Sequence, residues 1–150
     1  MRDERTINCR GNGMSHGLIF MKFEDGDSIG FDAVALKNIL SRNNCKIADN
    51  PDGSSFVEFP LNGESGTIGS EGSIQYHQEL AESFNIDRPL YDESLYKLWF
   101  ALMNELDVCC FTDYGGEIFA TSDISQHVPE GLLEDCEKGV QIINTIEDLQ

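Results

Sequence analysis

The chain has 150 residues, of which 40% are hydrophobic, and a formal net charge of -17, so it has the size and apolar content of a single folded domain. The charged residues 2–5 are not followed by the apolar core of a signal peptide, and the longest apolar stretch, 95–103, is far shorter than the roughly 20 residues that a membrane-spanning helix needs. We therefore expect a cytoplasmic protein of one domain, residues 1–150, without a membrane segment.

The first third of the chain carries the signals of a strand, a turn and a helix. The apolar run 18–23 predicts a strand, and the Asp-Gly pair within 24–27 predicts a hairpin turn into a partner strand at 28–31. Asp32 is a good helix N-cap, and apolar side chains at helical spacing then predict a helix to about Ser41.

A second hairpin and a glycine-rich loop are predicted next. The run 45–48 and the alternating residues 56–59 flank a cluster of turn residues at 49–53, which is typical of a β-hairpin. Glycines at every third position from Gly63 to Gly72 predict a mobile loop over 62–73, and nothing there indicates a domain boundary.

Two helices are predicted in the centre of the chain. Apolar residues four apart across 76–84 predict a helix that ends in the breaker region 85–89. A longer apolar stripe over 95–106, capped by Asp92, predicts the central helix of the fold and places Trp99 in the core.

The last part of the chain predicts a hairpin, a helix and a final strand. Runs 108–111 and 118–121 flank a turn and form the clearest hairpin signal of the chain. Pro129 suits the first turn of a helix that Gly139 ends, and 140–146 predicts a strand. This order of elements indicates an α+β fold, with an antiparallel or mixed sheet built from hairpins and about four helices, mostly on one face.

The cysteines and histidines do not show the spacing of a metal or redox site. The cysteines are odd in number and include no C-x-x-C pair, which is typical of reduced thiols, and the histidines lie apart from them. The adjacent Cys109 and Cys110 point to opposite faces of the predicted strand, so we expect one to be buried and the other semi-exposed. Whether either of them is reactive stays open, although acidic surroundings raise rather than lower the pKa of a thiol.

The turns and the glycine-rich loop do not match a calcium or nucleotide site either. The loop 62–73 contains no phosphate-binding motif, and no Lys or Arg occurs between Pro51 and Asp87. The aspartates of the turns do not follow the ligand spacing of a calcium loop. We therefore expect no metal and no cofactor, and the sequence identifies no catalytic residue.

The negative charge is concentrated in the later part of the chain. Acidic and basic side chains balance over residues 1–50, so residues 51–150 carry the entire net charge, with Arg88, Lys97 and Lys138 as their basic side chains. Such a surface repels a phosphate backbone and attracts a basic protein. The sequence therefore disfavours direct binding of nucleic acid and favours a basic protein partner, although the same charge also serves solubility.

In size, acidity and expected architecture, the whole chain resembles the immunity proteins with which bacteria neutralise toxin domains, such as those of contact-dependent inhibition and other polymorphic toxin systems. The resemblance implies a protein that binds a basic, nuclease-like toxin domain and covers its active site or a nearby surface. Two other functions stay open: a small hydrolase or transferase whose site is made of scattered residues, and an acidic inhibitor or nucleic-acid mimic from a mobile element. The oligomeric state is also open.

The candidate partner-binding residues come from the last hairpin and the helix after it. Exposed acids there would meet a basic partner, and Tyr114 would be the aromatic anchor, because aromatic residues are enriched among binding hot spots. The candidates are Asp113, Tyr114, Glu117, Glu130, Glu134, Asp135 and Glu137.

Overall fold

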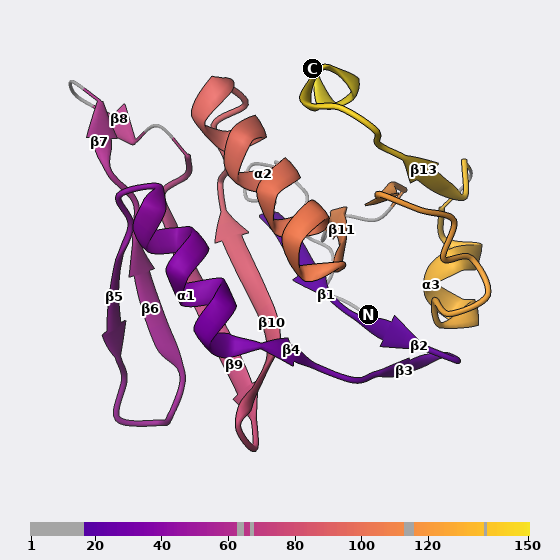
Figure 1. Ribbon diagram of the computed structural model, residues 1–150, viewed down its shortest axis with the longest axis horizontal. Helices are drawn as coiled ribbons and strands as arrows, with labels where there is room; N and C mark the ends of the chain where they lie inside the picture. The colour runs from indigo at the N-terminus through magenta and orange to yellow at the C-terminus, as the bar shows by residue number, and fades with distance from the viewer. Residues whose placement is uncertain (1–16, 63–64, 67, 113–115, 137) are drawn as a thin grey trace, which may run out of the picture.

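The computed structural model describes residues 17–62, 65–66, 68–112, 116–136 and 138–150, and Figure 1 shows its arrangement. The main sheet contains β1 (Gly17–Met21), β4 (Phe31–Asp32), β5 (Lys46–Asp49), β6 (Ser55–Glu58), β9 (Glu71–His77), β10 (Leu80–Asp87), β11 (Cys109–Thr112), β12 (Ile118–Ala120) and β13 (Val140–Ile142). Two short hairpins lie outside it, β2 (Phe23–Glu24) with β3 (Asp27–Ser28) and β7 (Leu61–Asn62) with β8 (Ser65–Gly66).

The order of the strands differs from their order in the chain at one important place. Across the described residues the order is β13-β12-β11-β1-β10-β9-β6-β5, and β4 pairs with β10. Neighbouring strands are antiparallel, except that β13 runs parallel to β12. The early strand β1 lies between β10 and β11, so it joins the two halves of the sheet.

The helices begin where the sequence places their caps. The helices among the described residues are α1 (Ala33–Arg42), α2 (Glu93–Leu106), α3 (Glu130–Glu134) and the 3-10 helix η2 (Ile146–Leu149). The side chain of Asp32 accepts a hydrogen bond from Ala35 N at 3.0 Å, and that of Asp92 accepts one from Leu95 N at 3.3 Å. Both predicted N-caps are therefore confirmed.

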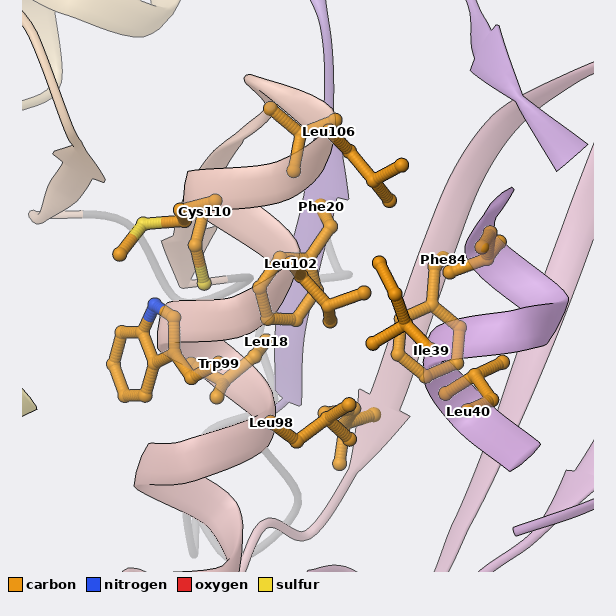
Figure 2. Close-up of a cluster of buried hydrophobic side chains, with 14 of the residues drawn as sticks. Leu18, Phe20, Ile39, Leu40, Phe84, Leu98, Trp99, Leu102, Leu106 and Cys110 are labelled. Atoms are coloured by element: carbon orange, nitrogen blue, oxygen red, sulfur yellow. The ribbon is translucent and has the colours of Figure 1, made fainter. Parts of the chain in front are cut away.

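The main core lies between one face of the sheet and helices α1 and α2. In the strand register Phe20 is opposite both Phe84 and Cys110, so all three side chains point to the same face. Figure 2 shows Leu98 and Leu102 of α2 packed among these residues and the side chains of α1. It also shows that Trp99 lies on the side of α2 away from α1.

The short helix α3 covers the opposite face of the sheet. Ile118 and Ala120 flank Phe119 along β12, so they point away from the side on which Phe119 meets Trp99. They form a second buried cluster with Cys109, and Leu132 and Leu133 of α3 pack against it. The α+β class is therefore confirmed, but α-helices cover both faces of the sheet.

The predicted helix over 76–84 is wrong. These residues form the end of β9, a tight turn and most of β10, whose antiparallel pairing runs from Leu80 opposite His77 to Asp87 opposite Glu71. The turn includes Gln78 with φ 60°, a left-handed conformation that the sequence does not signal with Gly or Asn. Without this helix, the described residues contain three α-helices where about four were expected.

Several strand predictions need smaller corrections. The predicted strand 18–23 is divided: residues 18–21 belong to β1, whose partners are β10 and β11, and Phe23 begins the small β2–β3 hairpin. The end of the predicted mobile loop 62–73 is packed, because Ile68 is buried and β9 already begins at Glu71. The expected hairpins β5–β6 and β11–β12 are confirmed, and the final strand ends at Ile142.

Candidate functional site

The candidate partner-binding residues lie on two elements of the later chain. Asp113, Tyr114 and Glu137 fall outside the described residues. Glu117 is partly buried and lies directly before β12. The remaining candidates are exposed on α3 and at its C-cap, and they are Glu130, Glu134 and Asp135.

Glu117 and Asp135 both act on the thiol of Cys136. Burial raises the pKa of the Cys136 thiol, and the negative charges of Asp135 and Glu117 raise it further. A hydrogen bond with the backbone of Gly116 has the opposite effect and lowers this pKa. Both carboxylates therefore act on the same sulfur atom. The structure thus brings the C-terminal end of α3 to the base of the β11–β12 hairpin.

Further acidic residues gather at the same end of the sheet. Asp87 on β10 is opposite Glu71 on β9 and opposite Gly17 on β1. The next residue of β1, Leu18, is opposite Thr112 on β11, and Thr112 N donates a hydrogen bond to Glu117 O. Glu71 and Asp87 therefore share one row of the sheet, and Glu117 lies beside Thr112 in the next row, at the same end. Helix α2 starts shortly after Asp87, so its first residues belong to this end too. We call these residues the acidic end: Glu71, Asp87, Asp92, Glu93, Glu117 and Asp148.

The acidic end has little charge compensation. Among the described residues, the ion pairs between a Lys or Arg and a carboxylate are Arg42 with Glu105 and Lys22 with Asp107. None of the acidic-end residues takes part in them, although Arg88 directly follows Asp87. Like charges directly opposite each other on a sheet are destabilising, so the Glu71–Asp87 pair is unfavourable in the protein alone.

A cavity of about 360 Å³ opens at the acidic end, between α2 and the strands that follow it. Trp99 and Thr112 are its most buried lining residues, and Tyr91 and Asp148 are exposed. The lining residues are Tyr91, Trp99, Thr112, Glu117, Phe119, Gln141, Asp148 and Leu149. The cavity therefore combines aromatic side chains with two carboxylates, and no described residue that lines it is basic.

Two buried donors on this lining have no hydrogen-bond partner. They are Trp99 Nε1 and Gln141 Nε2, and among the described residues no other buried side-chain nitrogen or oxygen is unpartnered in this way. The Trp99 ring meets the ring of Phe119 edge-on, with 5.1 Å between ring centroids. A buried donor without a partner has a free-energy cost that a well-packed core normally avoids, so an acceptor from a ligand or an ordered water would lower the free energy at these two residues.

Asp148 is held in its charged form. Its Oδ2 atom accepts hydrogen bonds from Asn144 N at 2.8 Å and Thr145 N at 3.1 Å. These bonds stabilise the carboxylate and lower the pKa of Asp148 below its ordinary value. Both bonds end on Oδ2, so they do not use the other carboxylate oxygen. Asp148 therefore presents a fixed negative charge beside the cavity.

The thiols of the described chain are core groups. Burial raises the pKa of Cys45 to about 11 and that of Cys109 to about 12, and it also raises the pKa of Cys110. Cys109 and Cys110 are both buried, so the expectation of one semi-exposed thiol is wrong, because α3 covers the face that Cys109 occupies. Among the described residues no group of His, Cys, Asp and Glu is placed to hold a metal ion.

The comparisons with family models, with curated proteins and with solved structures find no match for this chain. In the described part of the chain, no helix is long and apolar enough to pass through a membrane. The functional argument therefore depends on the acidic end and its cavity.

The sequence identified only Glu117 among the lining residues of the cavity. Trp99 was assigned to the core, and it is 3% exposed, but its unpartnered nitrogen could not be foreseen from an apolar stripe. Gln141 and Asp148 reach the cavity because β13 pairs in parallel with β12, and nothing in the sequence signals that pairing.

Proposed function

We propose that this protein binds and neutralises a basic protein, in the manner of a bacterial immunity protein that covers a nuclease-like toxin domain. The observation that carries the proposal is the uncompensated acidic end. There Glu71 and Asp87 are directly opposite each other, and Glu117 lies at the same end of the sheet, in the next row. A basic partner offsets the repulsion between these carboxylates, and this relief contributes favourably to the free energy of binding.

The same surface explains how neutralisation takes place. A toxin that cleaves nucleic acid needs a basic groove for the phosphate backbone. The acidic end attracts that groove over a long range, and the bound protein then excludes the nucleic acid from it. Asp135 and the other exposed acids of α3 extend the surface beside Glu117.

A binding role also agrees with the state of the thiols. A nucleophilic cysteine acts as a thiolate and needs a lowered pKa. Cys45 and Cys109 have raised pKa values and are buried, so they favour a role in packing over covalent catalysis.

The test is capture of the partner followed by a growth assay. The protein is immobilised and exposed to the proteins of its source cells at low and moderate salt, and retained proteins are identified by mass spectrometry. We expect a basic protein that stops growth when expressed alone and is harmless when this protein is co-expressed. Retention of no basic protein, or of one that does not affect growth, contradicts the proposal.

Two charge-reversal variants locate the surface. The double variant Glu71→Lys and Asp87→Lys changes the acidic end, whereas Glu79→Lys and Glu82→Lys makes the same charge change near the opposite end of the same two strands. Figure 1 shows this control position at the β9–β10 turn, at the bottom of the view. We expect the first variant to lose protection against the captured toxin and the second to keep it.

A further inference from the structure

We propose that the cavity at the acidic end receives the side chain of one arginine of the partner. This inference rests on the proposed function and makes it specific, because it names the group that the partner inserts. The cavity has about 360 Å³, near the lower limit of the roughly 300–1,000 Å³ of small-molecule pockets. A site of this size suits a single side chain with part of its main chain.

The charge of the lining selects a cation. Glu117 and Asp148 both line the cavity, and no described lining residue is Lys, Arg or His. The hydrogen bonds to Asp148 Oδ2 keep its carboxylate ionised and fixed in place. A positively charged group therefore finds two carboxylates without a competing basic side chain on the lining.

The shape and chemistry of the walls favour arginine over lysine. Three aromatic residues, Tyr91, Trp99 and Phe119, line the cavity. The guanidinium group is flat and weakly hydrated, so it stacks on aromatic rings and donates pairs of hydrogen bonds to carboxylates. The ammonium group of lysine is compact and strongly hydrated, so it gains less from such walls.

The unpartnered donors indicate that the partner also brings an acceptor. Gln141 Nε2 and Trp99 Nε1 are buried without a hydrogen-bond partner, and both residues line the cavity. A guanidinium group has no acceptor, but the main-chain carbonyl of the inserted residue has one. An acceptor within reach of these two side chains would remove the free-energy cost of their unpaired donors. The cavity therefore matches a complete arginine residue better than a free cation.

The experiment uses the whole protein and the emission of Trp99, the single tryptophan of the chain. The probe is N-acetylarginine methylamide, and its control is N-acetylcitrulline methylamide, which replaces the guanidinium group by a neutral urea of the same shape. We expect a saturable change of emission with the arginine compound and binding at least about tenfold weaker with the citrulline compound. No saturable change, or equal binding of both compounds, overturns the inference.

Matched variants assign the effect to the cavity. Glu117→Gln and Asp148→Asn each remove one lining charge, and the asparagine keeps an oxygen for the hydrogen bonds from Asn144 and Thr145. Glu147→Gln removes the same charge from the adjacent exposed residue, which does not line the cavity. We expect about tenfold weaker probe binding for each lining variant and less than about a twofold change for the control. An equal loss of probe binding in the Glu147→Gln control would mean that the overall negative charge of the protein, and not the cavity, attracts the probe. That result overturns the inference.

The same variants separate this inference from the proposed function. If the captured toxin binds Glu117→Gln and Asp148→Asn as tightly as it binds the unchanged protein, the cavity is not the arginine site, and the proposed function stands. If the probe binds as expected but no basic protein is retained, the proposed function fails, and the cavity is an arginine site that serves another ligand.

Discussion

Two buried side chains, Trp99 and Cys109, differ in how the fold accommodates their polar groups. Trp99 contributes a large apolar surface to the packing of α2 and also carries a donor that folding leaves without a partner. Cys109, on the other face of the sheet, lies in a smaller cluster and keeps its proton because it is buried there. The Nε1 donor of Trp99 therefore has no hydrogen-bond partner in the free protein. The neutral thiol of Cys109, by contrast, is stable in its apolar surroundings.

The burial of Cys109 predicts how stability depends on pH. The pKa of this thiol rises from 9.0 to about 12 on folding, so the unfolded chain loses the proton first when the pH increases. The contribution of Cys109 is therefore complete below about pH 9 and is lost as the pH rises toward 12.

We expect Cys109→Ala to flatten the decrease in the free energy of unfolding above pH 9, by up to about 1.4 kcal/mol per pH unit. Urea denaturation between pH 8 and pH 10.5, with a reducing agent present, measures the two slopes. Comparison of slopes removes the constant cost of the smaller alanine side chain. Parallel slopes in the two proteins would show that the folded thiol ionises normally.

Among the secondary-structure elements, β9 depends most directly on the size of one residue. A Cβ atom on Gly72 would lie 2.9 Å from Phe59 Cζ and 3.1 Å from Asn85 O, which is too close for either neighbour. Gly131 in α3 is different, because a Cβ atom there would have no neighbour within 4 Å. Neither glycine has a positive φ, so sterics alone distinguish the two positions.

We expect Gly72→Ala to destabilise the protein by about 1–3 kcal/mol through overpacking. Gly131→Ala should stabilise it by about 0.5–1 kcal/mol, because alanine loses less backbone freedom in a helix. Equilibrium urea denaturation of both variants measures these differences. A neutral effect of Gly72→Ala would mean that Phe59 moves without cost.

The elements also show what the sequence could and could not predict. Asp32 and Asp92 mark the starts of α1 and α2, because capping is a local interaction that the sequence displays directly. The segment 76–84 has a helix-like spacing, but its pairing in β9 and β10 is determined by distant strands and by the unsignalled turn at Gln78. The caps were therefore predicted correctly, whereas long-range strand pairing overrode the local periodicity of 76–84.

The candidate site shows the same distinction. Glu117 was predicted because its charge and its place near a hairpin are visible in the sequence. The cavity beside it was not predicted, since it is lined by α2, β12, β13 and η2, which are far apart in the chain. Its unpartnered donors exist only once these elements are packed together.

At the scale of the whole molecule, the net charge of -17 determines how the protein approaches a partner. A field of this strength acts on a basic protein before contact, but salt restricts its range to ~8 Å at physiological ionic strength. Contacts inside the complex are screened much less.

We expect the association rate with the captured toxin to fall as the salt concentration rises, while the dissociation rate changes less. Stopped-flow measurement of Trp99 emission at several salt concentrations gives both rates. The variant with Glu71→Lys and Asp87→Lys should associate more slowly and with a weaker salt dependence than the variant with Glu79→Lys and Glu82→Lys. An association rate that does not depend on salt contradicts electrostatic attraction.

The position of β1 has a consequence for the order in which this protein becomes functional. Leu18 pairs with Ile86 on one side and with Thr112 on the other. Strand β1 therefore cannot complete its pairing until β10 and β11, which are synthesised much later, are available. Until then no strand pairing joins the two halves of the sheet, and contacts between residues so distant in sequence form slowly. The acidic end is assembled only when β1 closes this gap. A nascent chain therefore lacks the surface that we assign to the proposed partner until β1 has paired with both β10 and β11.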